Sequence, residues 1–273
     1  MNDQNMYTNL VRLSKNAHDT VCIATNWGAR RQWRLFSADR IGSGGAHITK
    51  SSFWTVSRGC KMKKHIVCLG DSNTHGYCAD PTDCADGGNR FNEDERWPCL
   101  LQKALGDEYL VIEEGLSGRT TVFPDPLHES MDALSVIYSI LKSHESVDLL
   151  IIMLGTNDTK DRFGANAYCI SLGMERLLAK ARSVDCWGEM GPNILVVAPA
   201  PIGREMVDDG MGIHCAEKSE ELAKYYEPLA KSLGCHFLDA KDCEVNPIDY
   251  THLSKNGHSQ LAKMLADVVP KII

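Results

Sequence analysis

Ser72 follows directly after residues 65–69 (His-Ile-Val-Cys-Leu), an apolar run that is typical of a buried strand. Gly70 permits a sharp turn at the strand's end, so we expect Ser72 at the carboxyl edge of a sheet, where parallel sheets hold their reactive groups. A serine hydroxyl is a weak nucleophile until a base accepts its proton. The sequence therefore predicts a nucleophile at Ser72 if a base lies elsewhere in the chain.

That base is expected at His252, preceded by Asp249 in the pattern Asp-x-x-His. Histidine is the side chain whose ordinary pKa suits proton transfer near neutral pH, and an aspartate can hold its tautomer and stabilise its charged form. Residues three apart share one side of a helical turn, so we expect Asp249 to reach the imidazole. His75 is close to Ser72 in sequence, but its offset suits the rim of a pocket better than the base.

Asn157 supplies a candidate donor for the negative oxygen that forms during attack on an ester. It follows residues 147–154, the most apolar run of the chain and hence a central strand. If the strand order is 2-1-3-4-5, Asn157 lies beside the end of the first strand, and its side-chain amide can donate to an oxyanion.

Strands must alternate with helices to bring these residues together. The apolar runs predict strands at residues 65–69, 109–112, 147–154, 194–197 and 235–238. Helical spacing of apolar residues predicts helices at 95–105, 131–143, 165–182, 216–233 and 255–269. This alternation indicates an α/β fold, a three-layer α/β/α sandwich around a five-stranded parallel sheet.

Charge divides the 273-residue chain into two unlike parts. Residues 1–64 carry eleven Lys and Arg against three acids, whereas the remainder carries 18 basic and 33 acidic residues. We interpret residues 1–61 as a basic N-terminal extension outside the catalytic fold, and residues 62–273 as the catalytic domain. The scattered charges of the extension show no nucleic-acid pattern, and no apolar stretch is long enough to span a bilayer. Neither a nucleic-acid nor a membrane partner is expected, and a cytoplasmic location is the default.

Eleven cysteines show no pairing framework, so we expect free thiols in a reducing compartment. Cys68, Cys169 and Cys235 lie in apolar runs and are expected to behave as small hydrophobes. Cys78 and Cys84 flank an acidic loop without the neighbouring histidines of a zinc site. No metal and no cofactor are expected.

The motifs together resemble the SGNH or GDSL hydrolases, over about four fifths of the chain. The resemblance lies in Gly70-Asp71-Ser72, in Gly118, in Gly155-x-Asn157-Asp158 and in Asp249-x-x-His252. It implies a flavodoxin-like sheet, a triad of Ser72, Asp249 and His252, and an oxyanion hole formed by Ser72, Gly118 and Asn157. Residues 111–121 and 151–160 are similar to the arylesterase branch of that family. That branch implies short-chain acyl esters as small-molecule substrates, acyl transfer to alcohols or peroxide as a side activity, and a possible homo-oligomer.

The predicted function is therefore a serine esterase acting on small, acetyl-type esters through an acyl-enzyme. A carbohydrate O-acetyl esterase could use the same residues in a more open cleft. A protein of another class, a non-catalytic flavodoxin-like binding module, could keep the motif residues for structure alone. His75, Tyr77, Leu116 and Phe123 are the candidate substrate-binding residues.

Overall fold

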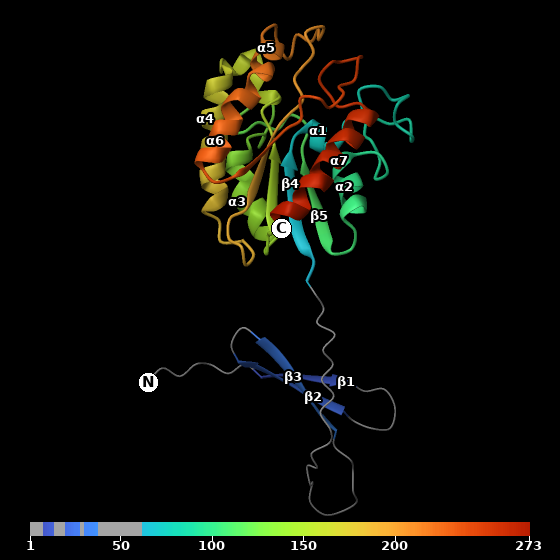
Figure 1. Ribbon diagram of the computed structural model, residues 1–273, viewed down its shortest axis with the longest axis vertical. Coiled ribbons are helices and arrows are strands. Elements are labelled where there is room, and N and C mark those ends of the chain that lie inside the picture. The colour runs from blue at the N-terminus through green and yellow to red at the C-terminus, as the bar shows by residue number, and fades with distance from the viewer. Residues whose placement is uncertain (1–7, 14–19, 28–29, 38–61) are drawn as a thin grey trace, which may run out of the picture. The chain divides into compact units, whose positions relative to one another are not determined.

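A computed structural model describes residues 62–273 together with the backbone of residues 8–13, 20–27 and 30–37. The chain divides into two compact units, Met1–Cys60 and Lys61–Ile273. In the first unit, β1 (Thr8–Leu13), β2 (Thr20–Trp27) and β3 (Arg30–Ser37) pair in this order as an antiparallel sheet (Figure 1). The rest of the predicted N-terminal extension lies outside the described residues, and its separateness from the catalytic fold stays a prediction.

The second unit is built on a five-stranded parallel sheet with the order β5-β4-β6-β7-β8. This is the predicted order 2-1-3-4-5. Strands β4 and β6 lie inside the sheet and are apolar along most of their length because helices cover both of their faces. The strands are β4 (Lys64–Gly70), β5 (Tyr109–Gly115), β6 (Leu149–Met153), β7 (Ile194–Ala198) and β8 (His236–Asp239).

Helices cover both faces of this sheet, as predicted, and give a three-layer α/β/α sandwich (Figure 1). One layer consists of α3 (Ala133–Ser143), α4 (Ala167–Arg182) and α6 (Leu222–Ser232). The opposite layer consists of α2 (Trp97–Leu105) and α7 (Lys255–Ile272). Four short helices lie in the connections: α1 (Ser72–His75), η1 (Asn157–Thr159), η2 (Asp161–Phe163) and α5 (Cys215–Glu220).

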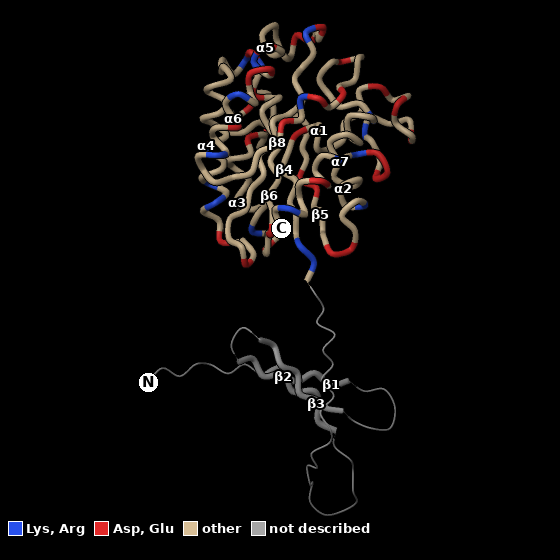
Figure 2. The backbone as a smooth tube through the Cα atoms, in the orientation of Figure 1, with Lys and Arg blue, Asp and Glu red and all other residues tan. Residues whose placement is uncertain are grey.

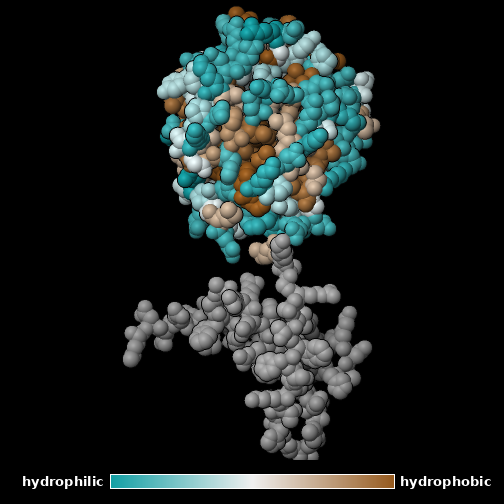
Figure 3. Space-filling model, in the orientation of Figure 1, coloured by the Kyte–Doolittle hydropathy of each residue, from teal (hydrophilic) through white to brown (hydrophobic). Residues whose placement is uncertain are grey.

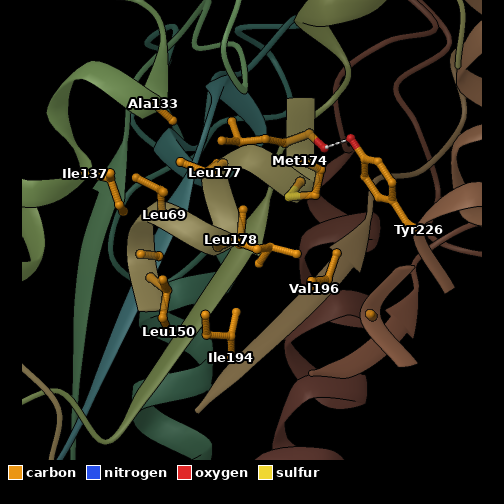
Figure 4. Close-up of a cluster of buried hydrophobic side chains, with 14 of the residues drawn as sticks. Leu69, Ala133, Ile137, Leu150, Met174, Leu177, Leu178, Ile194, Val196 and Tyr226 are labelled. Carbon is orange, nitrogen blue, oxygen red and sulfur yellow. Dashed lines mark hydrogen bonds between the residues drawn. The ribbon is translucent and has the colours of Figure 1, made fainter. Parts of the chain in front are cut away.

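The core forms because successive strand residues point to opposite faces of the sheet. In β4, Val67 and Leu69 pack toward α3 and α4, whereas Ile66 and Cys68 pack toward α2 and α7. Figure 4 shows the first of these clusters, where the Tyr226 hydroxyl donates a hydrogen bond to a backbone carbonyl (3.2 Å). On the face drawn in Figure 3, apolar residues also gather between α6 and α7, bordered by hydrophilic ones.

The helix predicted at 216–233 is in fact two helices, α5 and α6. The chain turns at Glu221, whose N–H bonds to the Lys218 carbonyl three residues back (3.3 Å) rather than four. A 3₁₀-type closure of this kind ends one helix and lets the next start in a new direction. Apolar periodicity continues across the break, so no pattern in the sequence predicts it. No helix among the described residues is long and apolar enough to cross a bilayer.

His258 fixes the start of α7 against α2. Its ring is fully buried, its Nδ1 accepts a hydrogen bond from the Trp97 N–H (3.3 Å), and it meets Phe91 edge to face. Burial lowers the pKa of His258 to about 3. The folded protein therefore keeps this imidazole neutral, whereas the unfolded chain protonates it as the pH falls below its ordinary pKa of 6.5.

This difference predicts a specific acid sensitivity. Between about pH 7 and about pH 5, the unfolding free energy of the wild type should fall by about 2 kcal/mol because of His258. His258→Asn, whose side chain can still accept from the Trp97 N–H, should not show this fall. Urea unfolding of both proteins at the two pH values measures it. Equal losses in wild type and variant would show that His258 does not cause the acid sensitivity.

Candidate active site

Ser72 is placed by a tight turn at the end of β4. A Cβ at Gly70 would collide with the Thr74 side chain and the Met153 carbonyl, so only glycine fits there. Asp71 then caps α1, because its Oδ1 accepts from the Asn73 N–H (3.0 Å). Ser72 is the first residue of α1, where backbone N–H groups have no acceptor within the helix. The turn therefore offers both the hydroxyl and the N–H of Ser72 at the sheet's carboxyl edge.

The structure brings the predicted base and acid to this serine. His252 Nε2 lies 2.8 Å from Ser72 Oγ, across 180 residues of sequence. The other ring nitrogen, Nδ1, lies 2.5 Å from Asp249 Oδ2. Burial raises the pKa of Asp249, but the hydrogen bond and charge of His252 outweigh it, so the pKa lies below its ordinary value. Asp249 therefore stays ionised and can hold His252 with its Nε2 lone pair toward the serine.

The spacing of Asp249 and His252 predicted that they share a helical turn. In the structure they lie instead in an irregular turn before α7. Tyr250, between them, has a left-handed φ of 53°. The turn is held by hydrogen bonds at its base, from Asn246 N to the His252 carbonyl (2.7 Å) and from Leu253 N to Asn73 Oδ1 (2.8 Å). The second bond ties the segment that carries the base directly to the turn that carries the nucleophile.

The predicted oxyanion donors face the same cavity. Ser72, Gly118 and Asn157 all line it, and Gly118 has a φ of +90° that favours glycine. The Asn157 amide donates to the Arg119 carbonyl (3.2 Å) and, over a longer distance, to Asp71 Oδ2 (3.4 Å), so an oxyanion would replace the longer of these two bonds. These contacts fix the plane of the amide beside the serine, as a preorganised donor requires.

Two buried acids lie beneath this donor. Burial raises the pKa of Asp71 to about 6, and it does the same for Asp158. Asp158 Oδ1 accepts from the N–H and hydroxyl of Thr121, which anchors η1 to the turn after β5. At neutral pH, Asp71 is mostly a carboxylate and can accept from the Asn157 amide.

Replacing Asn157 by alanine should lower kcat on a short-chain ester by on the order of 10²–10³-fold with little change in KM, because the lost donor acts mainly on the transition state. Steady-state kinetics measure the effect. Asn166→Ala is the matched control, since Asn166 caps α4 away from the cavity. Near-normal turnover of Asn157→Ala would remove this amide from the oxyanion hole.

The serine opens into a cavity of about 890 Å³. Tyr77 forms part of its wall, and its ring packs on the His252 ring with the centroids 4.5 Å apart. Tyr77 is one of the four substrate-binding residues expected from the sequence. Tyr77 therefore both shapes the cavity and supports the imidazole.

The other three candidates, His75, Leu116 and Phe123, lie outside the wall of this cavity. The carbonyl of His75 accepts from Arg90 Nε (2.8 Å) on the other side of the turn. Leu116 is a surface residue, 39% exposed. Phe123 packs beside Phe163, with ring centroids 5.8 Å apart, and against the core. A role for these three residues in substrate binding stays a prediction.

Charged residues that we did not assign from sequence line the cavity instead. Burial lowers the pKa of Lys160, and no carboxylate lies within ion-pair distance of its ammonium among the described residues. Arg162 is paired with the buried Asp125 (2.8 Å). Acids from the loop after β7 complete the wall: Glu205, Asp208 and Asp209. Figure 2 shows charged residues of both signs in the loops at this end of the sheet.

No group of three His, Cys, Asp or Glu side chains suited to a metal ion is found in the part of the chain that the structure describes.

Comparison with known proteins agrees with this geometry. The family model of GDSL-like lipases and acylhydrolases matches residues 68–264. The chain belongs to this family. The match spans all four of the motifs named above, from the strand before Ser72 to the helix after His252.

Solved members of the SGNH type resemble the chain over its second unit. Est24, a carbohydrate acetylesterase from Sinorhizobium meliloti, is 35% identical, with a TM-score of 0.70, covering 77% of this chain and 100% of that chain. The aryl esterase of M. smegmatis is 34% identical, with a TM-score of 0.69 and the same coverage. The α/β/α sandwich is thus that of SGNH hydrolases, and the matched domain is a carboxylic ester hydrolase.

A curated relative, an acetylxylan esterase from Xylanibacter ruminicola, is 23% identical over 227 residues. The match covers 75% of this chain but only 42% of that enzyme, so the chain spans less than half of the relative's length.

Proposed function

We propose that the protein is a serine esterase that hydrolyses short-chain acyl esters, acetyl esters above all, through an acyl-enzyme. The observation that carries this proposal is the line of hydrogen bonds from Asp249 through His252 to Ser72 Oγ, which ends in a cavity beside the Asn157 amide.

In the first half of the reaction, His252 Nε2 takes the Ser72 proton while the oxygen attacks the ester carbonyl. The tetrahedral oxyanion accepts hydrogen bonds from the N–H groups of Ser72 and Gly118 and from the Asn157 amide. Collapse breaks the bond to the alkoxy oxygen, which leaves as an alcohol with the proton from His252. The acyl group stays on Ser72.

In the second half, a water molecule gives its proton to His252 and attacks the acyl-enzyme. Collapse then releases the carboxylic acid and returns the proton to Ser72 Oγ. An alcohol or hydrogen peroxide that reached the acyl-enzyme would yield a new ester or a peracid in the same way, and we propose this acyl transfer as a side activity.

4-Nitrophenyl acetate tests the proposal against a non-catalytic binding module. We expect either a burst of nitrophenol equal in amount to the enzyme, or steady turnover of the ester. The rate should fall from the acetyl to the butyryl to the octanoyl ester. A protein that shows neither burst nor turnover would be a binding module. Turnover that rises with acyl length would contradict the short-chain assignment.

A second candidate function, a carbohydrate O-acetyl esterase, is favoured by the charged wall of the cavity. Lys160 and the acids of the loop after β7 can exchange hydrogen bonds with the hydroxyls of a sugar, whereas a flat aromatic leaving group offers them no such partners. The carbohydrate acetylesterase and acetylxylan esterase among the similar proteins support this candidate.

Lys160→Met should separate the two candidates. If a sugar leaving group binds the ammonium, KM for an acetylated monosaccharide should rise roughly 10-fold, while KM for 4-nitrophenyl acetate should stay within about 2-fold. Lys263→Met, on the exposed face of α7, is the matched control. A KM that is unchanged for the sugar ester would argue against carbohydrate recognition by Lys160.

A further inference from the structure

Two thiols that ester hydrolysis does not use lie together beside the active site. Cys78 and Cys84 are 1% and 4% exposed and share a small buried cluster with Phe91. The Cys78 thiol donates to the Asp80 carbonyl (2.9 Å), and the Cys84 thiol to the Arg90 carbonyl (3.0 Å). Burial, together with a smaller contribution from the Cys84 thiol, raises the pKa of Cys78 to about 11. Because both side chains pack in this one cluster, the two thiols are near neighbours in the folded loop.

The loop that carries both thiols, residues 78–90, contacts the segment of the catalytic base. It starts directly after Tyr77, whose ring packs on His252. Tyr77 and Arg90 pair as an antiparallel bridge that closes the loop. Farther along, Asp83 Oδ2 accepts from the Lys255 N–H (3.3 Å) at the start of α7. A change in the stiffness of this loop would therefore reach the imidazole.

We propose that Cys78 and Cys84 are a redox-sensitive dithiol, which closes to a disulfide in exchange with a small-molecule disulfide and so stabilises the loop behind His252. Both cysteines lie in a loop rather than in a rigid strand or helix, so their backbones can adjust to the separation that a disulfide requires.

The exchange proceeds in two balanced steps. When local opening of the loop exposes the thiols to solvent, one cysteine loses its proton and, as its thiolate, attacks the sulfur–sulfur bond of oxidised glutathione, forms a mixed disulfide and expels one glutathione thiolate. The second cysteine, again as its thiolate, attacks the protein sulfur of that mixed disulfide and expels the other glutathione. The two protein thiols are oxidised, the reagent is reduced to two thiols, and these receive the two protons.

The test uses the full-length, reduced protein incubated with oxidised glutathione, then denatured and alkylated. Cleavage at Asp80 and Asp83, which lie between the two cysteines, leaves fragments that only a disulfide can join. Mass spectrometry without reduction should find the two fragments joined, with neither cysteine alkylated, and dithiothreitol should separate them. The oxidised protein should also melt on the order of 5 °C higher.

Cys84→Ala provides the control and should lose both the joined fragments and the rise in melting temperature. Cys169 reports that the reagent has acted. It was expected to behave as a small hydrophobe, but it is exposed in the first turn of α4 because its position faces away from the sheet. Glutathione on Cys169 with Cys78 and Cys84 both alkylated would overturn the proposal. A disulfide without any melting shift would overturn its stabilising role. Neither readout depends on ester hydrolysis, so the result stands apart from the proposed function.

Discussion

Ser72→Ala should lower kcat on 4-nitrophenyl acetate by on the order of 10⁶-fold, because no acyl-enzyme can form and the remaining groups only polarise the ester. The hydroxyl lies 2.8 Å from His252 Nε2, and alanine removes it without adding volume to a nearly buried position. The nitrophenol burst and the steady-state rate both measure the loss.

Ser117→Ala is the matched control, because Ser117 lines the same cavity but has no imidazole beside it. Its kcat should stay within about 2-fold of wild type. If Ser117→Ala lost the burst and Ser72→Ala kept it, the nucleophile would have been assigned to the wrong serine.

Asp249→Asn should lower kcat by about 10⁴-fold with the fold intact. An asparagine amide that donates to Nδ1 would favour the imidazole tautomer with its proton on Nε2, and such a ring cannot accept the Ser72 proton. The depressed pKa of Asp249 fits this role, because the carboxylate remains an acceptor in mildly acidic solution.

The reaction of Ser72 with a fluorophosphonate is a second readout for Asp249→Asn. In this variant the serine should react more slowly than in the wild type, but the reaction should still proceed to completion. Asp242→Asn, on an exposed turn outside the cavity, should leave both rates unchanged. An Asp249→Asn enzyme with normal kcat would show that His252 is oriented by something else.

The sheet could be predicted because its strands are short apolar runs that a parallel sheet buries on both faces. β6 is buried along its whole length, and its run of apolar residues has no other explanation in the sequence. The order of strands is confirmed as well, because β6 pairs with β4 and brings Asn157 and Ser72 to the same cavity. Helix starts were less certain: α2 begins at Trp97 rather than Glu95, with Pro98 in its first turn.

The wall of the cavity could not be predicted, for a physical reason. Motif residues such as Ser72 and Asn157 stand at strand ends, which the sheet fixes, whereas the wall comes from loops whose course depends on distant contacts. Arg162 lines the cavity and forms an ion pair with Asp125. The two residues are far apart in the sequence, and no local pattern predicts that they pair. Lys160 lies three residues after Asn157, but only the bend of η1 and η2 places it in the cavity.

The 180 residues between Ser72 and His252 also matter during synthesis. A ribosome translating this message releases the nucleophile and then four further strands of the sheet, β5 to β8, before it adds the histidine. A nascent or truncated chain that ends ahead of His252 therefore carries an inert hydroxyl, and catalytic competence arrives with the docking of α7.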